Sequence, residues 1–225
     1  MSMLLPKFFD RDACGVAKSL LGKFIRYKYK SIWLTARIIE TEAYYKHERG
    51  SHASLGITEK RKALFMSPGT IYMYYARGGD SLNVSCRGDG NAVLIKSAYA
   101  DASIQLSLDA IATMQQLNPA ASGAPRKPEK LCSGQTLLCR SMNILVPEWN
   151  QRAFNQQRFY FDDAGAAPEK IIQTTRLGIP EGRDEHLLYR FVDYALSKHC
   201  TSNPLTKRNW HEGREYNLLN NDGSL

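Results

Sequence analysis

The sequence predicts an α+β fold built on a mainly antiparallel β-sheet. Short runs rich in β-branched and aromatic residues follow one another in the first half of the chain, and tight turns separate them. Helical patterns lie before and after these runs, and no internal repeat or long linker divides the 225 residues. We therefore expect a single domain over residues 1–225, with a polar, frayed tail from about residue 217.

An amphipathic helix and a long hairpin are predicted at the N-terminus. Apolar side chains recur at helical spacing over residues 10–21, where Asp10 is the expected N-cap and Gly22 the terminator. Residues 23–29 and 32–44 have the composition of two strands around a short break. The second of these strands is unusually long, so it is expected to be a main element of the sheet.

A basic loop and three further strands follow. Residues 47–70 combine glycine and proline with many charged side chains, which is typical of a protruding functional loop. Residues 71–75, 82–86 and 92–98 are strand candidates, and the glycine-containing run 87–91 predicts a tight turn between the last two. Three neighbouring strands joined by short turns make the sheet mostly antiparallel.

The second half of the chain mixes helices and strands. Apolar side chains at helical spacing predict one helix over 104–114 and another over 131–145. Residues 159–161 and 187–194 are candidates for late strands of the same sheet.

The composition suggests a partner that carries negative charge. Thirty Lys and Arg residues against 22 Asp and Glu residues give a formal net charge of +8. This balance fits a polyphosphate partner, although many proteins use net charge only for solubility. The five cysteines are scattered without a C-x-x-C pair, so neither a disulfide scaffold nor a zinc knuckle is indicated.

The N-terminal residues do not resemble an export signal. No basic region is followed by an apolar stretch, and no window reaches the length of a membrane span. We expect no secretion and no membrane partner, and a location in the cytoplasm, associated with the nucleoid, or in the nucleus.

The segment RIIETEAY at residues 37–44 is the most informative for chemistry. On a strand, the side chains of Glu40, Glu42 and Tyr44 point to one face. Adjacent carboxylates repel one another unless a cation pairs with one of them while the other is held for proton transfer. The octapeptide alone favours a solvated polar face of an edge strand, and the alternative interpretation is an acid–base site.

Aromatic and histidine side chains give a second set of candidates. Tyr72 and Tyr74 share one face of a strand, where packing is the ordinary explanation and a stacking wall for a cationic purine is the alternative. His47 and His52 lie five residues apart in the basic loop, which is not the metalloprotease spacing. A loop histidine is usually solvated, so no metal site is expected.

Six motifs in a fixed order point to a known family: RIIETEAY, SHAS, PGTIYMY, LNVS, GDGNAVLIK and LCSG. Together they resemble the alkyladenine (3-methyladenine) DNA glycosylase family over about residues 5–192. Six ordered motifs are far more specific than any one of them, so the resemblance outweighs the solvated-strand and packing interpretations above. It also implies a single domain whose sheet is curved and surrounded by helices.

The resemblance implies a role for each matched side chain. Glu42 would be the general base that activates the water attacking the anomeric carbon, and its charge would stabilise the growing positive charge on the sugar. Tyr44 and His52 would form one wall of the base pocket and Tyr74 the opposite wall. Asn83 would crowd the exocyclic amino group of a normal guanine and so reject it.

This chain departs from the family pattern at two places. Lys96 stands where the family commonly has an arginine that helps to position the attacking water, and it keeps the charge without the planar fork. The wedge that fills the hole left by the flipped base usually follows a Tyr-Gly-Met pattern, whereas this chain is one residue shorter before Asn83. Arg77 aligns best as the wedge, and Tyr75 is the second candidate.

The implied function is that of a monofunctional DNA glycosylase in base-excision repair. It would act as a monomer on double-stranded DNA, without cofactor or metal, and flip alkylated or deaminated purines of the 3-methyladenine, 7-methylguanine, hypoxanthine and ethenoadenine class. Alkylation at N3 or N7 makes the base a ready leaving group, while neutral lesions need an acid that no motif supplies. No lysine in the motifs is presented as a Schiff-base nucleophile, so the expected product is an intact abasic site.

Two alternatives come from other classes of protein. A non-catalytic nucleic-acid-binding module could use the tyrosines and the basic loop as a stacking platform, but the carboxylate of Glu42 would weaken phosphate binding there. A saccharide hydrolase could use Glu40 and Glu42 as acid and nucleophile, but neutral sugars give no reason for a basic protein.

Overall fold

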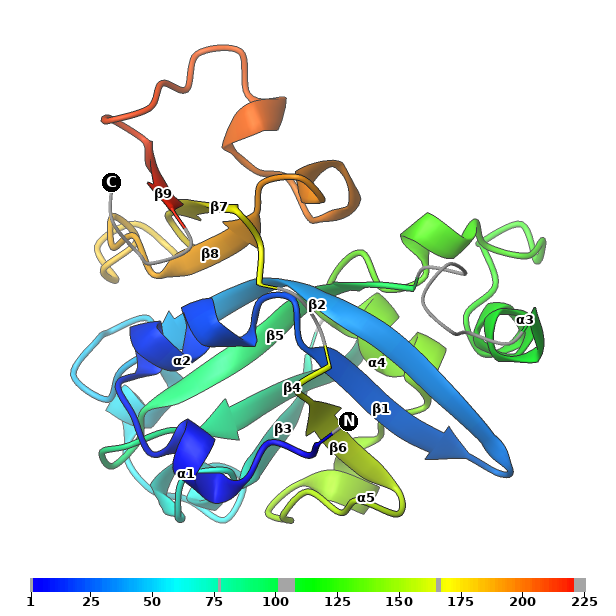
Figure 1. The fold of residues 1–225 in the computed structure, drawn as a ribbon. Helices are drawn as coiled ribbons and strands as arrows, with labels where there is room; N and C mark the ends of the chain where they lie inside the picture. The colour runs from blue at the N-terminus through cyan, green and yellow to red at the C-terminus, as the bar shows by residue number, and fades with distance from the viewer. Residues whose placement is uncertain (1, 77, 101–107, 165–166, 221–225) are drawn as a thin grey trace.

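The computed structural model describes residues 2–76, 78–100, 108–164 and 167–220, and its strands form one sheet (Figure 1). The strand order is β3 (Ile71–Ala76), β4 (Gly79–Ser85), β5 (Ala92–Tyr99), β2 (Ile32–Tyr44), β8 (Arg190–Asp193), β7 (Lys170–Thr174) and β9 (Tyr216–Asn220), with β1 (Phe24–Tyr29) paired to β2 and β6 (Phe159–Asp162) paired to β1. Every one of these pairings is antiparallel. The predicted α+β fold with a mainly antiparallel sheet is confirmed.

The long strand β2 is the centre of the sheet, and it arches across the molecule in Figure 1. Arg37 pairs with Phe24 of β1 on one edge and with Tyr99 of β5 on the other. Further along, β2 lies between β5 and β8. The interpretation of 37–44 as a solvated edge strand is therefore wrong, because Glu40 and Glu42 lie in this central part and are both 0% exposed.

Helices cover the sheet at several places. They are α1 (Pro6–Phe9), α2 (Ala13–Leu20), α3 (Leu108–Leu117), α4 (Gln135–Met142) and α5 (Val146–Trp149). Helix α2 packs on β2 and β5, and α4 packs on β4 and β5. The hydroxyl of Thr41 donates to the carbonyl of Ala17 in α2, which places α2 on the face of β2 opposite the side chain of Glu42.

The start of α2 differs from the prediction. Asp12, not Asp10, is the N-cap, and its carboxylate accepts a hydrogen bond from the backbone of Gly15. Asp10 instead follows the short helix α1 and pairs with Arg87. Pro6 opens a separate first turn, α1, so the second helix begins two residues later than predicted.

The two predicted later helices are shorter or divided. Residues 101–107 lie outside the described part of the chain, so the predicted helix at 104–114 is seen only from Leu108, as α3. Within 131–145, Gly134 has a φ of 117° and Asn143 a φ of 55°, and these two residues bound α4. Both are backbone conformations that a continuing α-helix does not allow.

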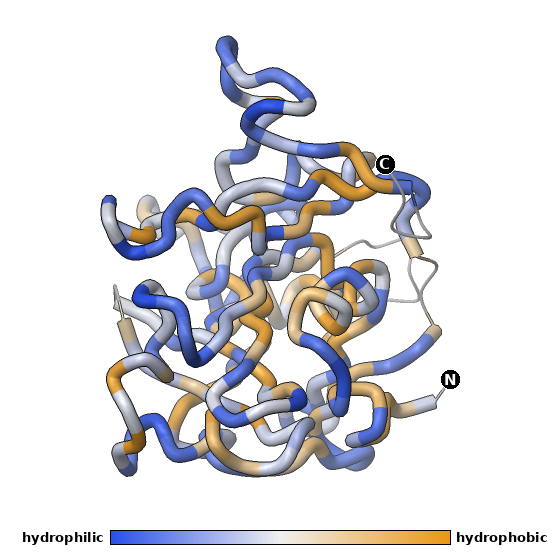
Figure 2. Tube along the Cα trace, turned by 90° about the vertical axis from the view of Figure 1, so that its left-hand side faces the viewer, coloured by the Kyte–Doolittle hydropathy of each residue, from blue (hydrophilic) through white to orange (hydrophobic). Residues whose placement is uncertain are grey.

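The C-terminal part holds strands that the sequence pattern did not predict. The expected frayed tail from about residue 217 is wrong for residues 217–220, because they belong to β9, which pairs along β7 and buries Leu219. The rest of the predicted tail, 221–225, lies outside the described residues. The predicted strand 187–194 is reduced to Arg190–Asp193. The segment between Thr206 and β9 protrudes from the molecule and is mostly hydrophilic (Figure 2).

A small apolar cluster anchors the basic loop to the sheet. The loop contains two 3-10 turns, η1 (His52–Leu55) and η2 (Lys62–Phe65). Ala53, Ala63 and Leu64 from these turns pack on Tyr72 and Ala92. The loop therefore has a fixed place over β3 and β5. No helix in the described ranges is long and apolar enough to cross a bilayer.

Candidate active site

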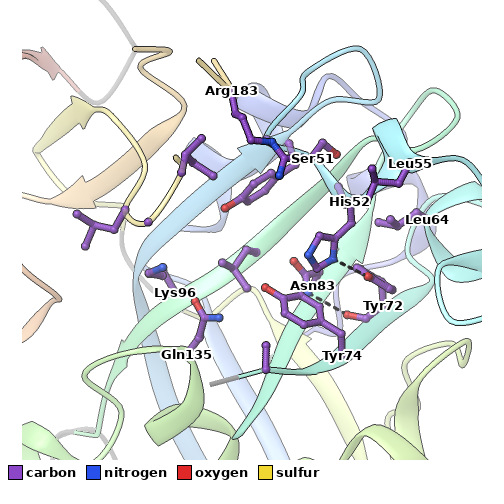
Figure 3. Close-up of a pocket in the computed structure, with 18 of the residues that line it drawn as sticks. Ser51, His52, Leu55, Leu64, Tyr72, Tyr74, Asn83, Lys96, Gln135 and Arg183 are labelled. Carbon is purple, nitrogen blue, oxygen red and sulfur yellow. Dashed lines mark hydrogen bonds between the residues drawn. The ribbon is translucent and has the colours of Figure 1, made fainter. Parts of the chain in front are cut away.

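A cavity of about 340 Å³ opens where the basic loop meets the sheet (Figure 3). Its walls come from β2, β3, β4 and β5, from the loop at η1, from the start of α4 and from residues 177–183 after β7. The lining includes Tyr44, His52, Tyr74, Asn83 and Lys96. Five of the side chains singled out by sequence are thus brought together around one space, although they come from four separate strands and a loop.

Glu42 lies beneath this cavity and is fully buried. Its carboxylate is 3.3 Å from the ammonium of Lys96, accepts a hydrogen bond of 2.7 Å from the hydroxyl of Tyr44, and accepts a longer one of 3.4 Å from the backbone of Leu177. Burial opposes ionisation, but Lys96, Arg190 and these two donors outweigh it and lower the pKa of Glu42. The site holds an ionised carboxylate.

Lys96 is the cation closest to that carboxylate. Its side chain is 9% exposed, lines the cavity, and pairs with Glu42 across the β2–β5 ladder. The ion pair fixes the Lys96 ammonium at the cavity wall.

Tyr44 contacts Glu42 and also lines the cavity. Its hydroxyl is bonded to Glu42, and burial together with the neighbouring carboxylate raises the pKa of the Tyr44 phenol. The guanidinium of buried Arg176 lies 4.5 Å from the centre of the Tyr44 ring. Because Arg176 does not line the cavity, it supports this ring from behind.

His52 and Tyr74 contact each other directly. Their ring centroids are 4.6 Å apart at an interplanar angle of 66°, and Nδ1 of His52 is 2.8 Å from the hydroxyl of Tyr72. Partial burial of the imidazole, with the positive charges of Arg61 and Arg183, lowers the pKa of His52. The resemblance implied opposite walls for His52 and Tyr74, and a purine can enter between these two rings only if one of them moves.

Asn83 is nearly buried at the back of the cavity, with 4% of its surface exposed. Its amide nitrogen donates to the carbonyl of Tyr72 across the β3–β4 ladder. This hydrogen bond fixes the side-chain amide relative to the aromatic wall.

The two wedge candidates, Tyr75 and Arg77, differ in whether the structure describes them. Tyr75, at the end of β3, is 69% exposed and points away from the core. Arg77 lies outside the described residues. Ala76 and Gly79 are paired as the ends of β3 and β4.

Several cavity residues were missed by the sequence analysis. Leu177, Ile179 and Arg183 line the cavity from the loop after β7, and Arg176 and Glu48 form a buried ion pair behind it. The glycines and proline of residues 178–182 are a loop signal. No spacing connects that loop, more than 130 residues along the chain, to Glu42.

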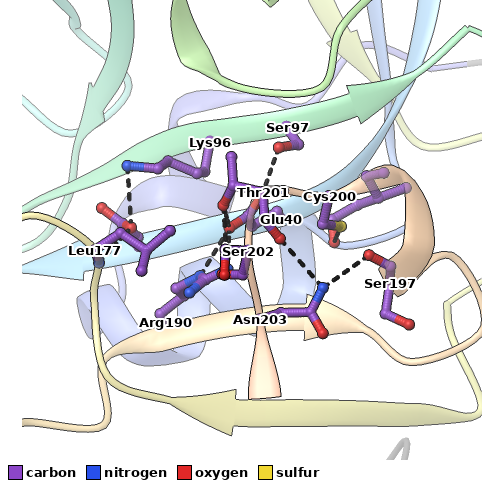
Figure 4. A network of polar contacts seen from close by, with 12 residues as sticks. Glu40, Lys96, Ser97, Leu177, Arg190, Ser197, Cys200, Thr201, Ser202 and Asn203 are labelled. Atoms are coloured by element: carbon purple, nitrogen blue, oxygen red, sulfur yellow. Dashed lines mark hydrogen bonds and ion pairs between the residues drawn. The ribbon is translucent and has the colours of Figure 1, made fainter. Parts of the chain in front are cut away.

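The other carboxylate of the ETEAY motif has a separate environment. Both oxygens of Glu40 accept hydrogen bonds from donors that surround it: Arg190, Thr201 and Ser97 (Figure 4). It is 0% exposed and does not line the cavity. In the described ranges, no group of three or more His, Cys, Asp or Glu side chains could hold a metal ion.

Comparison with known proteins gives a consistent family. Residues 7–195 match the family model described as methylpurine-DNA glycosylase (MPG). A protein of Pseudomonas savastanoi pv. phaseolicola named "Putative 3-methyladenine DNA glycosylase" is 62% identical over 220 residues, which cover 97% of this chain and 98% of that protein. A protein of the same name from Pseudomonas syringae pv. tomato is 60% identical over 216 residues, or 96% of each chain. The mouse "DNA-3-methyladenine glycosylase" is 31% identical over 191 residues, covering 77% of this chain and 54% of the mouse protein.

Proposed function

The chain belongs to the methylpurine-DNA glycosylase family, and we propose that it releases alkylated purines from duplex DNA by hydrolysis, with Glu42 as the base that activates water. As a DNA-3-methyladenine glycosylase it would serve base-excision repair, acting as a single-domain monomer. The observation that carries the proposal is the carboxylate of Glu42, which is fully buried beneath an aromatic cavity and still ionised.

An ionised carboxylate at this place can act twice. It can accept a proton from a water that attacks the anomeric carbon, and its charge stabilises the positive charge that develops on the sugar as the base departs. The Lys96 ammonium and the Tyr44 hydroxyl hold the two oxygens of Glu42 in place. A preorganised anion costs no rearrangement at the moment of reaction.

Lys96 supports a hydrolytic reaction rather than strand cleavage. A lysine must lose its proton to attack the sugar as an amine. The Lys96 nitrogen is engaged in the ion pair with Glu42, 3.3 Å away. We therefore propose a monofunctional enzyme whose product is an intact abasic site.

The cavity fits selection of a damaged purine. Its volume of about 340 Å³ is within the usual range of ligand sites, roughly 300–1,000 Å³. Tyr44 and Tyr74 offer ring faces for a flipped base, and the fixed amide of Asn83 would clash with the amino group of guanine. Cationic 3-methyladenine is expected to leave fastest. 7-Methylguanine is an equally good leaving group but keeps the amino group that Asn83 crowds, so it should leave more slowly. Hypoxanthine and ethenoadenine are neutral and need an acid, and the Tyr44 hydroxyl already donates to Glu42, so they should leave more slowly too.

Two residues remain candidates for the wedge. Exposed Tyr75 stands near the end of β3, where a side chain could enter the duplex, and Arg77 is two residues further along the sequence. The alignment of motifs favours Arg77, with Tyr75 second.

The rival functions fit the contacts less well. A saccharide hydrolase would need Glu40 as a free acid, but Arg190, Thr201 and Ser97 occupy both of its oxygens. A passive binding module would gain nothing from an ionised carboxylate under its stacking surface.

The test uses duplex oligonucleotides that carry 7-methylguanine, a stable 3-methyladenine analogue, ethenoadenine or hypoxanthine. The wild-type protein should release the base, and strand breaks should appear only after hot alkali. Borohydride should trap no covalent complex with the abasic product. Strand breaks that appear before alkali treatment, or a trapped complex, would contradict hydrolysis to an intact abasic site. Binding without base release would favour the non-catalytic module.

A further inference from the structure

Glu40 is held by an unusually complete set of donors. Nε and Nη2 of Arg190 lie 2.7 Å from Oε1, and the Thr201 hydroxyl donates to the same oxygen at 2.6 Å. The Thr201 backbone donates to Oε2 at 3.0 Å, and the Ser97 hydroxyl also donates there. A fully buried carboxylate whose two oxygens both accept hydrogen bonds is fixed in position.

Arg190 connects this carboxylate to Glu42. It is 1% exposed, and its position on β8 is directly opposite Glu42 in the β2–β8 register. Glu40 and Glu42 on β2, Lys96 on β5 and Arg190 on β8 therefore form a buried group of two anions and two cations. Tyr44 is the remaining titratable group that contacts Glu42. Each cation has one nearest anion, and Glu40 is the one that neutralises Arg190.

Thr201 comes from a segment beyond the family model, which ends at residue 195. Two hydrogen bonds from the amide nitrogen of Asn203, to the carbonyls of Ser197 and Thr201, hold this segment together, and the Thr201 donors to Glu40 place it beside β2 (Figure 4). The carbonyl of Ser202 also accepts from Arg190 at 2.8 Å. The C-terminal segment thus closes the donor set around Glu40.

We propose that Glu40, Arg190 and Thr201 are positioning residues that keep Glu42 available as a base, and that the segment after residue 195 completes this cluster. The inference rests on the proposed role of Glu42. If Glu40 lost its charge, the buried guanidinium of Arg190 would turn to Glu42 as its nearest anion and occupy the oxygen that should accept a proton from water. Thr201 holds the Glu40 carboxylate in place, and Glu40 in turn keeps Arg190 away from Glu42.

The experiment measures single-turnover excision of 7-methylguanine, and lesion affinity, for wild type, Glu40→Gln, Thr201→Val and the double variant Glu40→Gln/Arg190→Gln. We expect Glu40→Gln to slow excision on the order of tenfold and to change lesion Kd by less than about threefold. Removing Arg190 as well should restore part of the rate, because no unpaired cation then competes for Glu42. A purely structural role would make the double variant worse, not better. Thr201→Val keeps both charges and should slow excision less than Glu40→Gln.

Asp162→Asn is the matched control. Asp162 is also 0% exposed and accepts from Arg26 at 3.0 Å, but it lies on β6 and does not line the cavity. It should lose stability without losing excision rate. An unchanged rate in Glu40→Gln, or no recovery in the double variant, overturns the positioning role. If Glu42→Gln also kept its rate, the proposed function itself would fail, which is a separate outcome.

Discussion

At the residue scale, two glutamates two positions apart on β2 have different surroundings. Glu40 is enclosed by Arg190, Thr201 and Ser97, whereas Glu42 contacts Lys96 and Tyr44, which both line the cavity. Neighbouring carboxylates with different partners can take different roles, because each partner sets the protonation state and access of its own carboxylate. The chemistry of the pair thus depends on partners from β5, β8 and the C-terminal segment as well as on Tyr44 of the ETEAY motif itself.

Replacing Lys96 tests the charge that holds Glu42 ionised. Lys96→Met removes the nearest cation, so the pKa of Glu42 should rise. Since the base must be deprotonated to act, activity should need a higher pH: excision by Lys96→Met should fall on the order of tenfold more at pH 6 than at pH 8, relative to wild type. The measurement is the single-turnover rate against pH.

Lys96→Arg is the charge-preserving control. It keeps a cation beside Glu42 and introduces the planar fork common in the family, so its pH profile should match wild type and its rate should equal or exceed it. An identical pH profile for Lys96→Met and Lys96→Arg would show that this ion pair does not set the state of Glu42.

At the element scale, the β4–β5 turn holds the loop that carries His52. Gly90 has a φ of +80°, and a Cβ there would lie 2.7 Å from the Cβ of Ala53, the neighbour of His52 in η1. Its backbone also donates to the carbonyl of Leu64 in η2. Glycine at this position therefore permits the close approach of turn and loop.

Gly90→Ala should displace η1, and Gly213→Ala is its matched control. Gly213 has nearly the same φ, +79°, but nothing lies within 4 Å of its Cβ position. Both variants should lose about 1–2 kcal/mol to left-handed backbone strain. Only Gly90→Ala should lose roughly 1–3 kcal/mol more through overpacking, together with lesion affinity. Urea unfolding and lesion Kd check this, and equal losses in both variants would contradict the packing argument.

The elements that sequence predicted well are those with strong local signals. The bounds of β2 and the start of β5 were predicted because their composition and flanking turns are distinct. Strands β7 and β9 were missed because five-residue segments are too short to show a clear period. Their pairing with each other depends on residues far apart in sequence.

At the scale of the whole molecule, the candidate site is an assembly of distant segments. The motif residues could be predicted because the family keeps them in fixed order. Arg176, Arg190 and Thr201 could not, since each acts through a contact 130 or more residues away and none belongs to a recognisable motif. The direct contact between His52 and Tyr74 was not predicted either, because it depends on the packing of the loop.

The most direct test of the account replaces Glu42 by Gln and compares single-turnover excision and lesion binding on 7-methylguanine duplex DNA. Glu59→Gln is the control, because Glu59 is an exposed glutamate in the basic loop. If Glu42 is the base, Glu42→Gln should lose at least about a hundredfold in excision rate and keep a lesion Kd within about threefold of wild type. Glu59→Gln should keep both quantities. Excision by Glu42→Gln at a rate close to that of wild type would contradict the assignment of Glu42 as the base.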